Sequence, residues 1–147
     1  NEIAEDYPHI LAEHIYSDAA AQALVLNPGH FDVLVMENFL GDILSDLGGA
    51  TVGGIGLCAS GNVGDKHAYF EPIHGTAPDI AGQNIINPTA TMRTAAMMLR
   101  YLGYAASADR LETAIDAVYL AEDRLTPDQG GAATTDEFCR AVADRLN

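Results

Sequence analysis

The chain has 147 residues, of which 48% are hydrophobic, and its net charge is −14. This composition is typical of a soluble globular domain with a sizeable core. The acidic excess argues against a nucleic-acid partner, whose phosphates would be repelled. No apolar run approaches the ~20 residues that a membrane-spanning helix needs. Two cysteines without metal-ligand spacing, Cys58 and Cys139, favour the cytoplasm, or the mitochondrial matrix of a eukaryote, over a disulfide-forming compartment.

The first segments are predicted to be helical. Residues 3–15 have a helix-like apolar spacing that a proline interrupts. Ser17 or Asp18 can cap a second helix over 19–26, which the Asn-Pro-Gly sequence at 27–29 ends. The chain opens on an asparagine without a methionine, and we expect the beginning of a longer protein to be missing.

The run FDVLVM at 31–36 predicts a short buried strand, and NFLGDILSDLGG at 38–49 predicts a helix directly after it, an α/β arrangement. Asp42 and Asp46 would stand one above the other on this helix, beside its apolar stripe. Like charges at that spacing destabilise an isolated helix by roughly 0.2–0.5 kcal/mol. A divalent cation such as Mg²⁺ or Mn²⁺ would neutralise them. A solvated acidic face is the alternative that the spacing alone leaves open.

A glycine-rich stretch covers 48–64, and within it 54–59 fits the dinucleotide fingerprint G-x-G-x-x-A, with Glu71 near the place of a ribose-binding acid. That fingerprint requires a helix to open inside the motif, with its N-terminus aimed at the pyrophosphate. The sequence SGNVG that follows breaks helices. We therefore predict that this is not a Rossmann fold.

Residues 68–82, AYFEPIHGTAPDIAG, predict a short strand followed by a loop. Asn87 and Pro88 then provide an N-cap and a first-turn proline for a helix that ends at Gly103. The apolar spacing of this helix predicts that it is largely buried through Ala90, Met92, Ala95, Met98, Leu99 and Leu102.

Two more helices are predicted near 108–123 and 135–146. Thr134 and Glu137 have the spacing of a capping box at the start of the second one.

Taken together, NFLGDILSDL, VGGIGL, SGNVGD, FEPIHGTAPDIAG and NPTA closely resemble the isocitrate and isopropylmalate dehydrogenase family. These are metal-dependent, decarboxylating dehydrogenases of 2-hydroxy acids. The resemblance covers only the C-terminal part of a family member. It implies an α/β, isopropylmalate dehydrogenase-like fold in which two subdomains share one continuous mixed sheet. Residues 1–52 would end the subunit-interface and substrate subdomain, and 53–147 would complete the cofactor subdomain.

The resemblance also implies a metal site. In this family the aspartates matching Asp42 and Asp46 bind the catalytic Mg²⁺ or Mn²⁺, and the one matching Asp18 reaches the metal of the neighbouring subunit. The active site would therefore be shared across a homodimer or a higher homo-oligomer. The metal would hold the substrate hydroxyl and stabilise the enolate that remains when CO₂ leaves.

The same resemblance places the dinucleotide cofactor against the loop 74–82. Asp79 could accept both hydroxyls of an unphosphorylated ribose, which favours NAD over NADP. NADP-using members carry a basic residue followed by a tyrosine at that point, and Ile80 also departs from that pattern. Asn87 would contact the adenine and Glu71 the nicotinamide side. The implied cofactor residues are Glu71, His74, Gly75, Thr76, Ala77, Asp79, Ile80 and Asn87.

Each of these assignments has a plainer alternative. His74 could be a hydrogen-bonding loop residue, Asp79 a turn residue and Asn87 a helix cap only.

The implied reaction is the NAD-dependent oxidative decarboxylation of isocitrate, homoisocitrate or 3-isopropylmalate, and VGGIG and SGNVG favour the first two. The catalytic lysine and tyrosine, and the arginines that bind substrate carboxylates, are expected upstream of Asn1, so these residues alone should not turn over substrate. A non-catalytic regulatory subunit is the alternative, although such a subunit need not keep the three aspartates.

Overall fold

The computed structural model describes residues 2–146, and the chain divides into two compact units, residues 1–51 and 52–147. None of the helices among the described residues is both long and apolar enough to cross a bilayer.

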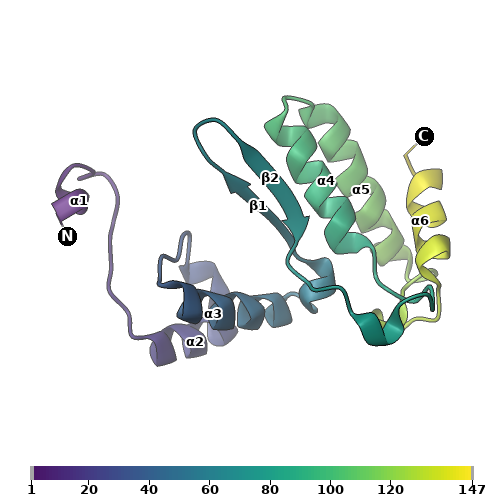
Figure 1. Ribbon diagram of the computed structural model, residues 1–147, viewed down its shortest axis with the longest axis horizontal. Helices are drawn as coiled ribbons and strands as arrows, with labels where there is room; N and C mark the ends of the chain where they lie inside the picture. The colour runs from purple at the N-terminus through teal and green to yellow at the C-terminus, as the bar shows by residue number, and fades with distance from the viewer. Residues whose placement is uncertain (1, 147) are drawn as a thin grey trace. The chain divides into compact units, whose positions relative to one another are not determined.

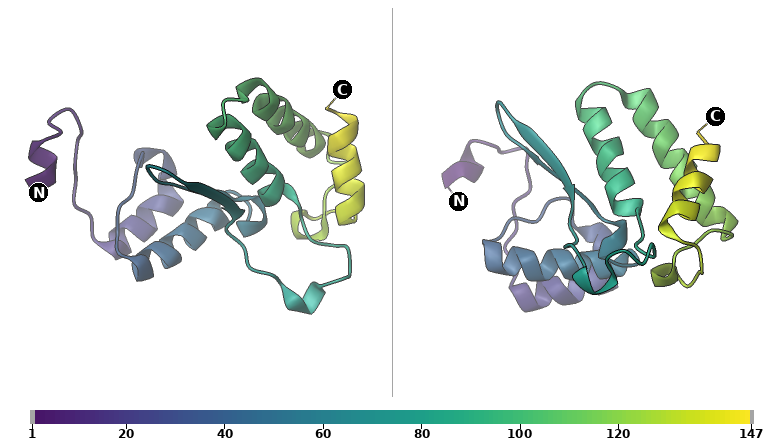
Figure 2. Two further views of the ribbon diagram at one scale, coloured as in Figure 1. Left: turned by 45° about the horizontal axis from the view of Figure 1, so that its top comes forward. Right: turned by 45° about the vertical axis from the view of Figure 1, so that its right-hand side comes forward.

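The first unit is built on two helices that pack against each other, α2 and α3 (Figures 1 and 2). Its core is small, because only Ala20, Leu44 and Gly49 are fully buried among its described residues. Its elements are α1 (Glu2–Glu5), α2 (Ser17–Leu26), the 3-10 turn η1 (Pro28–His30) and α3 (Asn38–Thr51).

The helical spacing predicted over 3–15 produces only the short helix α1, which ends at Glu5. Pro8 explains this early end, since proline lacks a backbone N–H and its ring clashes with the preceding helical turn. The second predicted helix, 19–26, is confirmed, and it begins at Ser17.

The predicted buried strand over 31–36 is wrong. This segment forms no ladder, and the side chains of Val33 and Val35 are 81% and 91% exposed. A strand needs a neighbour for its backbone N–H and C=O groups. The part of the chain that the structure describes places no strand beside this one.

The predicted helix over 38–49 is confirmed and continues to Thr51. Its N-terminus is capped by Glu37, whose carboxylate accepts hydrogen bonds from the backbone N–H groups of Phe39 at 3.1 Å and Leu40 at 3.0 Å. These bonds satisfy two of the N–H groups that lack a partner in the first helical turn.

The second unit contains an antiparallel hairpin of β1 (Ala59–Val63) and β2 (Ala68–Pro72), in which Ala59 pairs with Pro72 and Val63 with Ala68. The predicted short strand within 68–82 is thus confirmed as β2. The G-x-G-x-x-A stretch forms a 3-10 turn, η2 (Ile55–Leu57), that leads into β1 and not into a helix. This agrees with the prediction that the stretch is not a Rossmann fingerprint.

Three helices, α4, α5 and α6, follow the hairpin in this unit, and Figure 1 shows the hairpin and the helices side by side in chain order. The core lies between α5 and α6, with Phe138 and Ile115 completely buried. The remaining elements are η3 (Pro78–Ile80), α4 (Thr89–Tyr101), α5 (Ala105–Ala121), η4 (Pro127–Gln129) and α6 (Thr135–Asp144).

The predicted burial of α4 is only partly correct. Of the residues predicted to be buried, Ala90 is 0% exposed, whereas Met98 and Leu102 are 40% and 56% exposed. Helix α4 packs against both α5 and the hairpin, and its fully buried positions are alanines and threonines. Its larger apolar side chains therefore remain nearer the surface of the described chain.

The predicted capping box of α6 is confirmed. Thr134 Oγ1 accepts a hydrogen bond from the Glu137 backbone N–H at 3.2 Å, and the Thr134 N–H donates to Glu137 Oε2 at 2.8 Å. The hydrogen bonds from the backbone and hydroxyl of Thr134 lower the pKa of Glu137 from its ordinary value of 4.5.

We predict that Glu137→Gln lowers the melting temperature at pH 7 and that this difference shrinks as the pH falls below about 4.5. The folded-state pKa is depressed, so the ionised carboxylate stabilises the fold above the unfolded-state pKa. That stabilisation is lost as the pH falls through the folded-state pKa. Thermal unfolding of the full-length protein and the variant from pH 3 to pH 7 measures the effect. A melting-temperature difference that does not change with pH would contradict it.

Candidate metal and cofactor sites

Asp42 and Asp46 lie one turn apart on α3, and both are exposed. The predicted apolar stripe is only partly packed, because Leu44 is buried whereas Phe39 and Ile43, the stripe residues nearest the two aspartates, are 67% and 51% exposed. At about 100° per residue, both carboxylates lie roughly opposite Leu44 on the helix. Asp42 accepts a 3.4 Å hydrogen bond from Asn38 Nδ2. Neither carboxylate forms an ion pair with a described residue of this chain. Their mutual repulsion is therefore balanced by no positive side chain among these residues.

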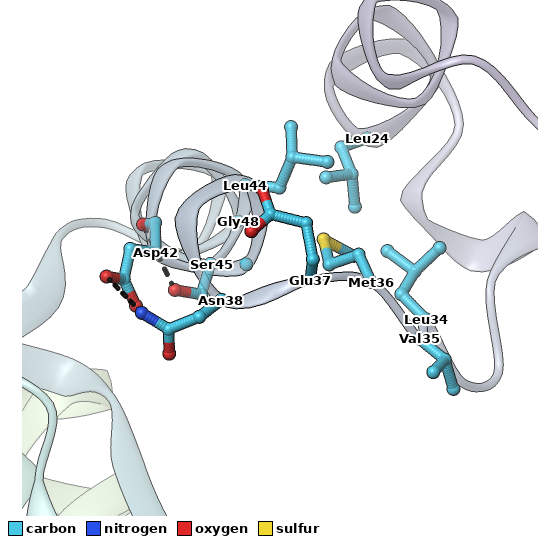
Figure 3. Close-up of a pocket in the computed structure, with 11 residues that line it drawn as sticks. Leu24, Leu34, Val35, Met36, Glu37, Asn38, Asp42, Leu44, Ser45 and Gly48 are labelled. Carbon is cyan, nitrogen blue, oxygen red and sulfur yellow. Dashed lines mark hydrogen bonds between the residues drawn. The ribbon is translucent and has the colours of Figure 1, made fainter.

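A cavity of about 580 Å³ within the first unit is lined by Asp42 but not by Asp46 (Figure 3). Leu24 and Leu44 contribute apolar walls, and the figure shows Asp42 and Asn38 turned away from Leu24. The cavity thus has an apolar side and a side with carboxylate, amide and hydroxyl oxygens. It is lined by Leu24, Leu34, Val35, Met36, Glu37, Asn38, Gly41, Asp42, Leu44, Ser45 and Gly48.

Asp18 lies in the first turn of α2, where its carboxylate accepts a 2.8 Å hydrogen bond from the Ala19 backbone N–H. Among the residues that the structure describes, no three His, Cys, Asp or Glu side chains gather closely enough to hold a metal. One copy of the chain therefore brings Asp42 and Asp46 together and leaves Asp18 apart. Two carboxylates still fit Mg²⁺ or Mn²⁺, because Mg²⁺ is commonly bound through one or two carboxylates together with water and substrate oxygens.

His74 is the most informative residue of the predicted cofactor loop. Its Nδ1 lies 2.9 Å from the Gly75 carbonyl oxygen, while its Nε2 is buried and has no hydrogen-bond partner within the described chain. If Nδ1–H donates to that carbonyl, the neutral ring leaves Nε2 as an acceptor. Most buried polar atoms have a partner, so this nitrogen fits a site in which a ligand donor would complete the pairing.

The loop after His74 is shaped by its backbone. Ala77 has a φ of +44°, in the left-handed region that non-glycine residues rarely adopt, and it introduces η3. Gln83 Nε2 donates to the Asp79 backbone carbonyl at 3.0 Å, and the exposed Asp79 carboxylate makes no hydrogen bond to a described residue. Gly75 and Thr76 are exposed, and Ile80 is half-buried. These features leave both polar groups and backbone available to a ligand.

Glu71 is exposed on β2, and it accepts a 2.8 Å hydrogen bond from the Tyr69 hydroxyl. This hydrogen bond, together with the carboxylate's negative charge, raises the pKa of Tyr69.

Asn87 is 5% exposed, and its side-chain amide is used within the chain. Its Oδ1 accepts a hydrogen bond from the Thr89 N–H at 3.0 Å, at the start of α4. The helix begins at Thr89 with Pro88 as its N-cap residue, one position later than the sequence predicted. Its Nδ2 donates to the Tyr119 hydroxyl at 3.1 Å and to Asp128 Oδ2 at 3.0 Å. The role of Asn87 at the start of α4 could be predicted from the sequence. Tyr119 and Asp128 could not, because they lie far along the chain and belong to no local motif.

Asp128 is the charged member of this polar cluster. Burial by itself would raise its pKa, but hydrogen bonds from Thr126, Asn87 and Gln129 outweigh that effect and lower the pKa below 3.8. The carboxylate is therefore ionised at neutral pH, where it can only accept hydrogen bonds.

Comparison with known proteins gives one consistent family. The model for "Isocitrate/isopropylmalate dehydrogenase" matches residues 1–142. The chain is 53% identical over 145 residues to the isocitrate/homoisocitrate dehydrogenase of Thermus thermophilus, and 51% identical over 144 residues to the 3-isopropylmalate/3-methylmalate dehydrogenase of Methanocaldococcus jannaschii. These alignments cover 99% and 98% of this chain. The chain spans 43% of the length of each of these two relatives.

Solved structures agree with this comparison. The chain resembles isocitrate dehydrogenase from Methylococcus capsulatus with a TM-score of 0.92 and 41% identity, covering 99% of this chain and 43% of that one. A β-decarboxylating dehydrogenase from Thermococcus kodakarensis gives a TM-score of 0.84 and 39% identity, with coverages of 99% and 42%. The α/β dehydrogenase fold predicted from the sequence is thereby supported. The predicted boundary near residue 52 and the predicted sheet shared between subdomains stay predictions.

Proposed function

The chain belongs to the isocitrate/isopropylmalate dehydrogenase family, and from this premise we propose that it is part of an NAD-dependent dehydrogenase that oxidises and decarboxylates a 2-hydroxy acid. The expected substrates are isocitrate, homoisocitrate or 3-isopropylmalate. The names of the relatives include all three acids, and the motifs VGGIG and SGNVG favour the first two. We also propose the cytoplasm, or the mitochondrial matrix in a eukaryote, as its location.

The observation that carries this proposal is the pair of exposed carboxylates on α3. Asp42 and Asp46 lie one helical turn apart and repel each other, neither forms an ion pair with a described residue, and Asp42 lines a cavity with a polar wall. A solvated acidic face would also expose two such carboxylates, and the family match favours the metal site over that alternative. We assign both residues as ligands of Mg²⁺ or Mn²⁺, with Asp18 supplied by a second copy of the chain.

A bound divalent cation would supply Lewis-acid stabilisation of negative charge on the substrate oxygen. Asp42 and Asp46 would hold that cation and, through it, orient the hydroxyl and carboxylate of the substrate. Because Asp18 does not join them within one copy, the shared site requires a homodimer or a larger homo-oligomer. The groups that move protons, a lysine and a tyrosine, are expected in the part of the protein before Asn1.

We assign each proposed cofactor residue to a different part of the dinucleotide. The buried His74 Nε2 needs a hydrogen-bond donor, and the loop 75–77 offers backbone groups to the adenosine and phosphates. The free carboxylate of Asp79 can accept the hydroxyls of an unphosphorylated ribose and would repel a 2′-phosphate. We propose that Ile80 and Glu71 also contact the cofactor, with Glu71 on the nicotinamide side. For Asn87, whose amide is engaged internally, we propose a contact to the adenine through its backbone.

We predict that Asp42→Asn and Asp46→Asn each weaken Mn²⁺ binding in the full-length protein by at least about tenfold and abolish substrate-enhanced Mn²⁺ binding. Each change removes one charged ligand and leaves the helix intact. Calorimetric titration of Mn²⁺ into the protein, with and without isocitrate, measures both effects. Asp32→Asn, which alters another exposed acid of the same unit, is the matched control and should change neither.

A wild-type protein that binds Mn²⁺ no better with any of the three hydroxy acids would favour the regulatory-subunit alternative. Unchanged Mn²⁺ binding in both aspartate variants would rule out the assigned ligands.

We predict a preference of the full-length enzyme for NAD over NADP that Asp79 maintains. Asp79→Ala should raise the KM for NAD by about tenfold, since a charged hydrogen bond to the ribose contributes roughly 1.5–3 kcal/mol. The same change should lower the KM for NADP because the repulsion disappears. Initial rates with each cofactor at saturating hydroxy acid test this, and a wild type that prefers NADP would contradict the assignment.

A further inference from the structure

The hydrogen-bonded cluster around Asn87 joins four segments of the second unit. Tyr119 brings in α5, since its hydroxyl accepts from Asn87 Nδ2 and lies 2.7 Å from Thr89 Oγ1. Gln129 brings in the glycine-rich stretch, because its Nε2 donates to the Gly53 carbonyl at 3.0 Å and to Asp128 Oδ2 at 3.1 Å. The segments before α4, within α5, after α5 and before β1 are thus held to one another by side chains.

Asp128 is the acceptor at the centre of this cluster. Its Oδ1 accepts from the Thr126 hydroxyl at 2.5 Å, and its Oδ2 accepts from both Asn87 and Gln129. Thr126 and Thr89 are 0% exposed, so the cluster is anchored in the interior. A carboxylate is the side chain that can accept all three of these hydrogen bonds at once.

The carboxylate also fixes which way the Asn87 amide faces. With Nδ2 directed at Asp128, Oδ1 is left to accept the Thr89 N–H at the start of α4. The opposite orientation would set Oδ1 against the carboxylate and the NH₂ group against a backbone donor. Asp128 therefore determines both the amide orientation and the capping of α4.

We propose that Asp128 is a positioning residue for the dinucleotide: it holds Asn87, and with it the backbone of residues 85–88, in the conformation that receives the adenine. This inference rests on the proposed function. Since the Asn87 side chain is 5% exposed and its amide is fully engaged, the cofactor meets the backbone of this segment, whose position depends on Asp128. The hydroxyl of Tyr119, on α5, accepts a second hydrogen bond from the Asn87 side chain and so helps to hold it.

The test compares Asp128→Asn and Tyr119→Phe with wild type in the full-length protein. An amide at position 128 has a single acceptor oxygen, so it cannot serve all three donors, and its NH₂ group faces one of them. Tyr119→Phe keeps the ring, which packs against Phe138, and removes the hydroxyl between Asn87 and Thr89. Asp144→Asn, an exposed acid on α6 of the same unit, is the charge-matched control.

For Asp128→Asn we expect the Kd for NAD, measured by calorimetry, and the KM for NAD to rise on the order of ten- to a hundredfold. We expect kcat to stay within about twofold, because no reacting group is removed. Tyr119→Phe should move both quantities in the same direction by a smaller factor, and the control should move neither. A merely structural role would lower the melting temperature and active fraction and leave the Kd of the folded protein unchanged.

An unchanged Kd in a folded Asp128→Asn variant would overturn the positioning role alone, provided that wild type binds NAD. If wild type binds no dinucleotide, the proposed function fails and this inference fails with it. If Asp128→Asn does not fold, an unchanged Kd in Tyr119→Phe overturns the role, and a raised Kd supports it.

Discussion

The repulsion between two carboxylates one helical turn apart is the constraint on which the account depends. Asp42 and Asp46 could each be replaced by a neutral residue with a small gain in helix stability. They are instead both exposed, neither forms an ion pair with a described residue, and Asp42 lines a cavity. On the proposed assignment, a divalent ion would remove this repulsion. The pair would then lower the stability of the isolated helix and supply the metal ligands of the assembled protein.

In the second unit, where we propose that the cofactor binds, the governing constraint is the hydrogen bonding of buried polar side chains. In the second unit the polar groups that are buried are almost all satisfied by one another, as around Asn87, Thr89 and Asp128. The exception among the described residues is His74 Nε2. On the proposed assignment, the hydrogen bonds of this cluster would position the backbone near the adenine, and the unpaired His74 Nε2 would accept a hydrogen bond from the ligand.

Local patterns predicted much of the structure, and long-range pairing explains most of what they missed. The helix over 38–49 and the Thr134 capping box depend on residues within one or two turns, and both are confirmed. The strand expected at 31–36 needs a neighbour that no local pattern supplies, and it is absent from the described residues. The place of Asn87 at the start of α4 was predictable to within one residue, but its hydrogen bonds to Tyr119 and Asp128 span 32 and 41 residues. Family resemblance supplied the roles of the aspartates, which helical spacing alone left undecided.

The most direct test of the account is a crystal structure of the full-length protein with Mn²⁺ and a hydroxy-acid substrate, recorded at a wavelength where manganese scatters anomalously. We predict an anomalous peak within about 2.3 Å of carboxylate oxygens of Asp42 and Asp46, with Asp18 of a second copy completing the site. Occupied substrate with no such peak between these carboxylates would contradict it.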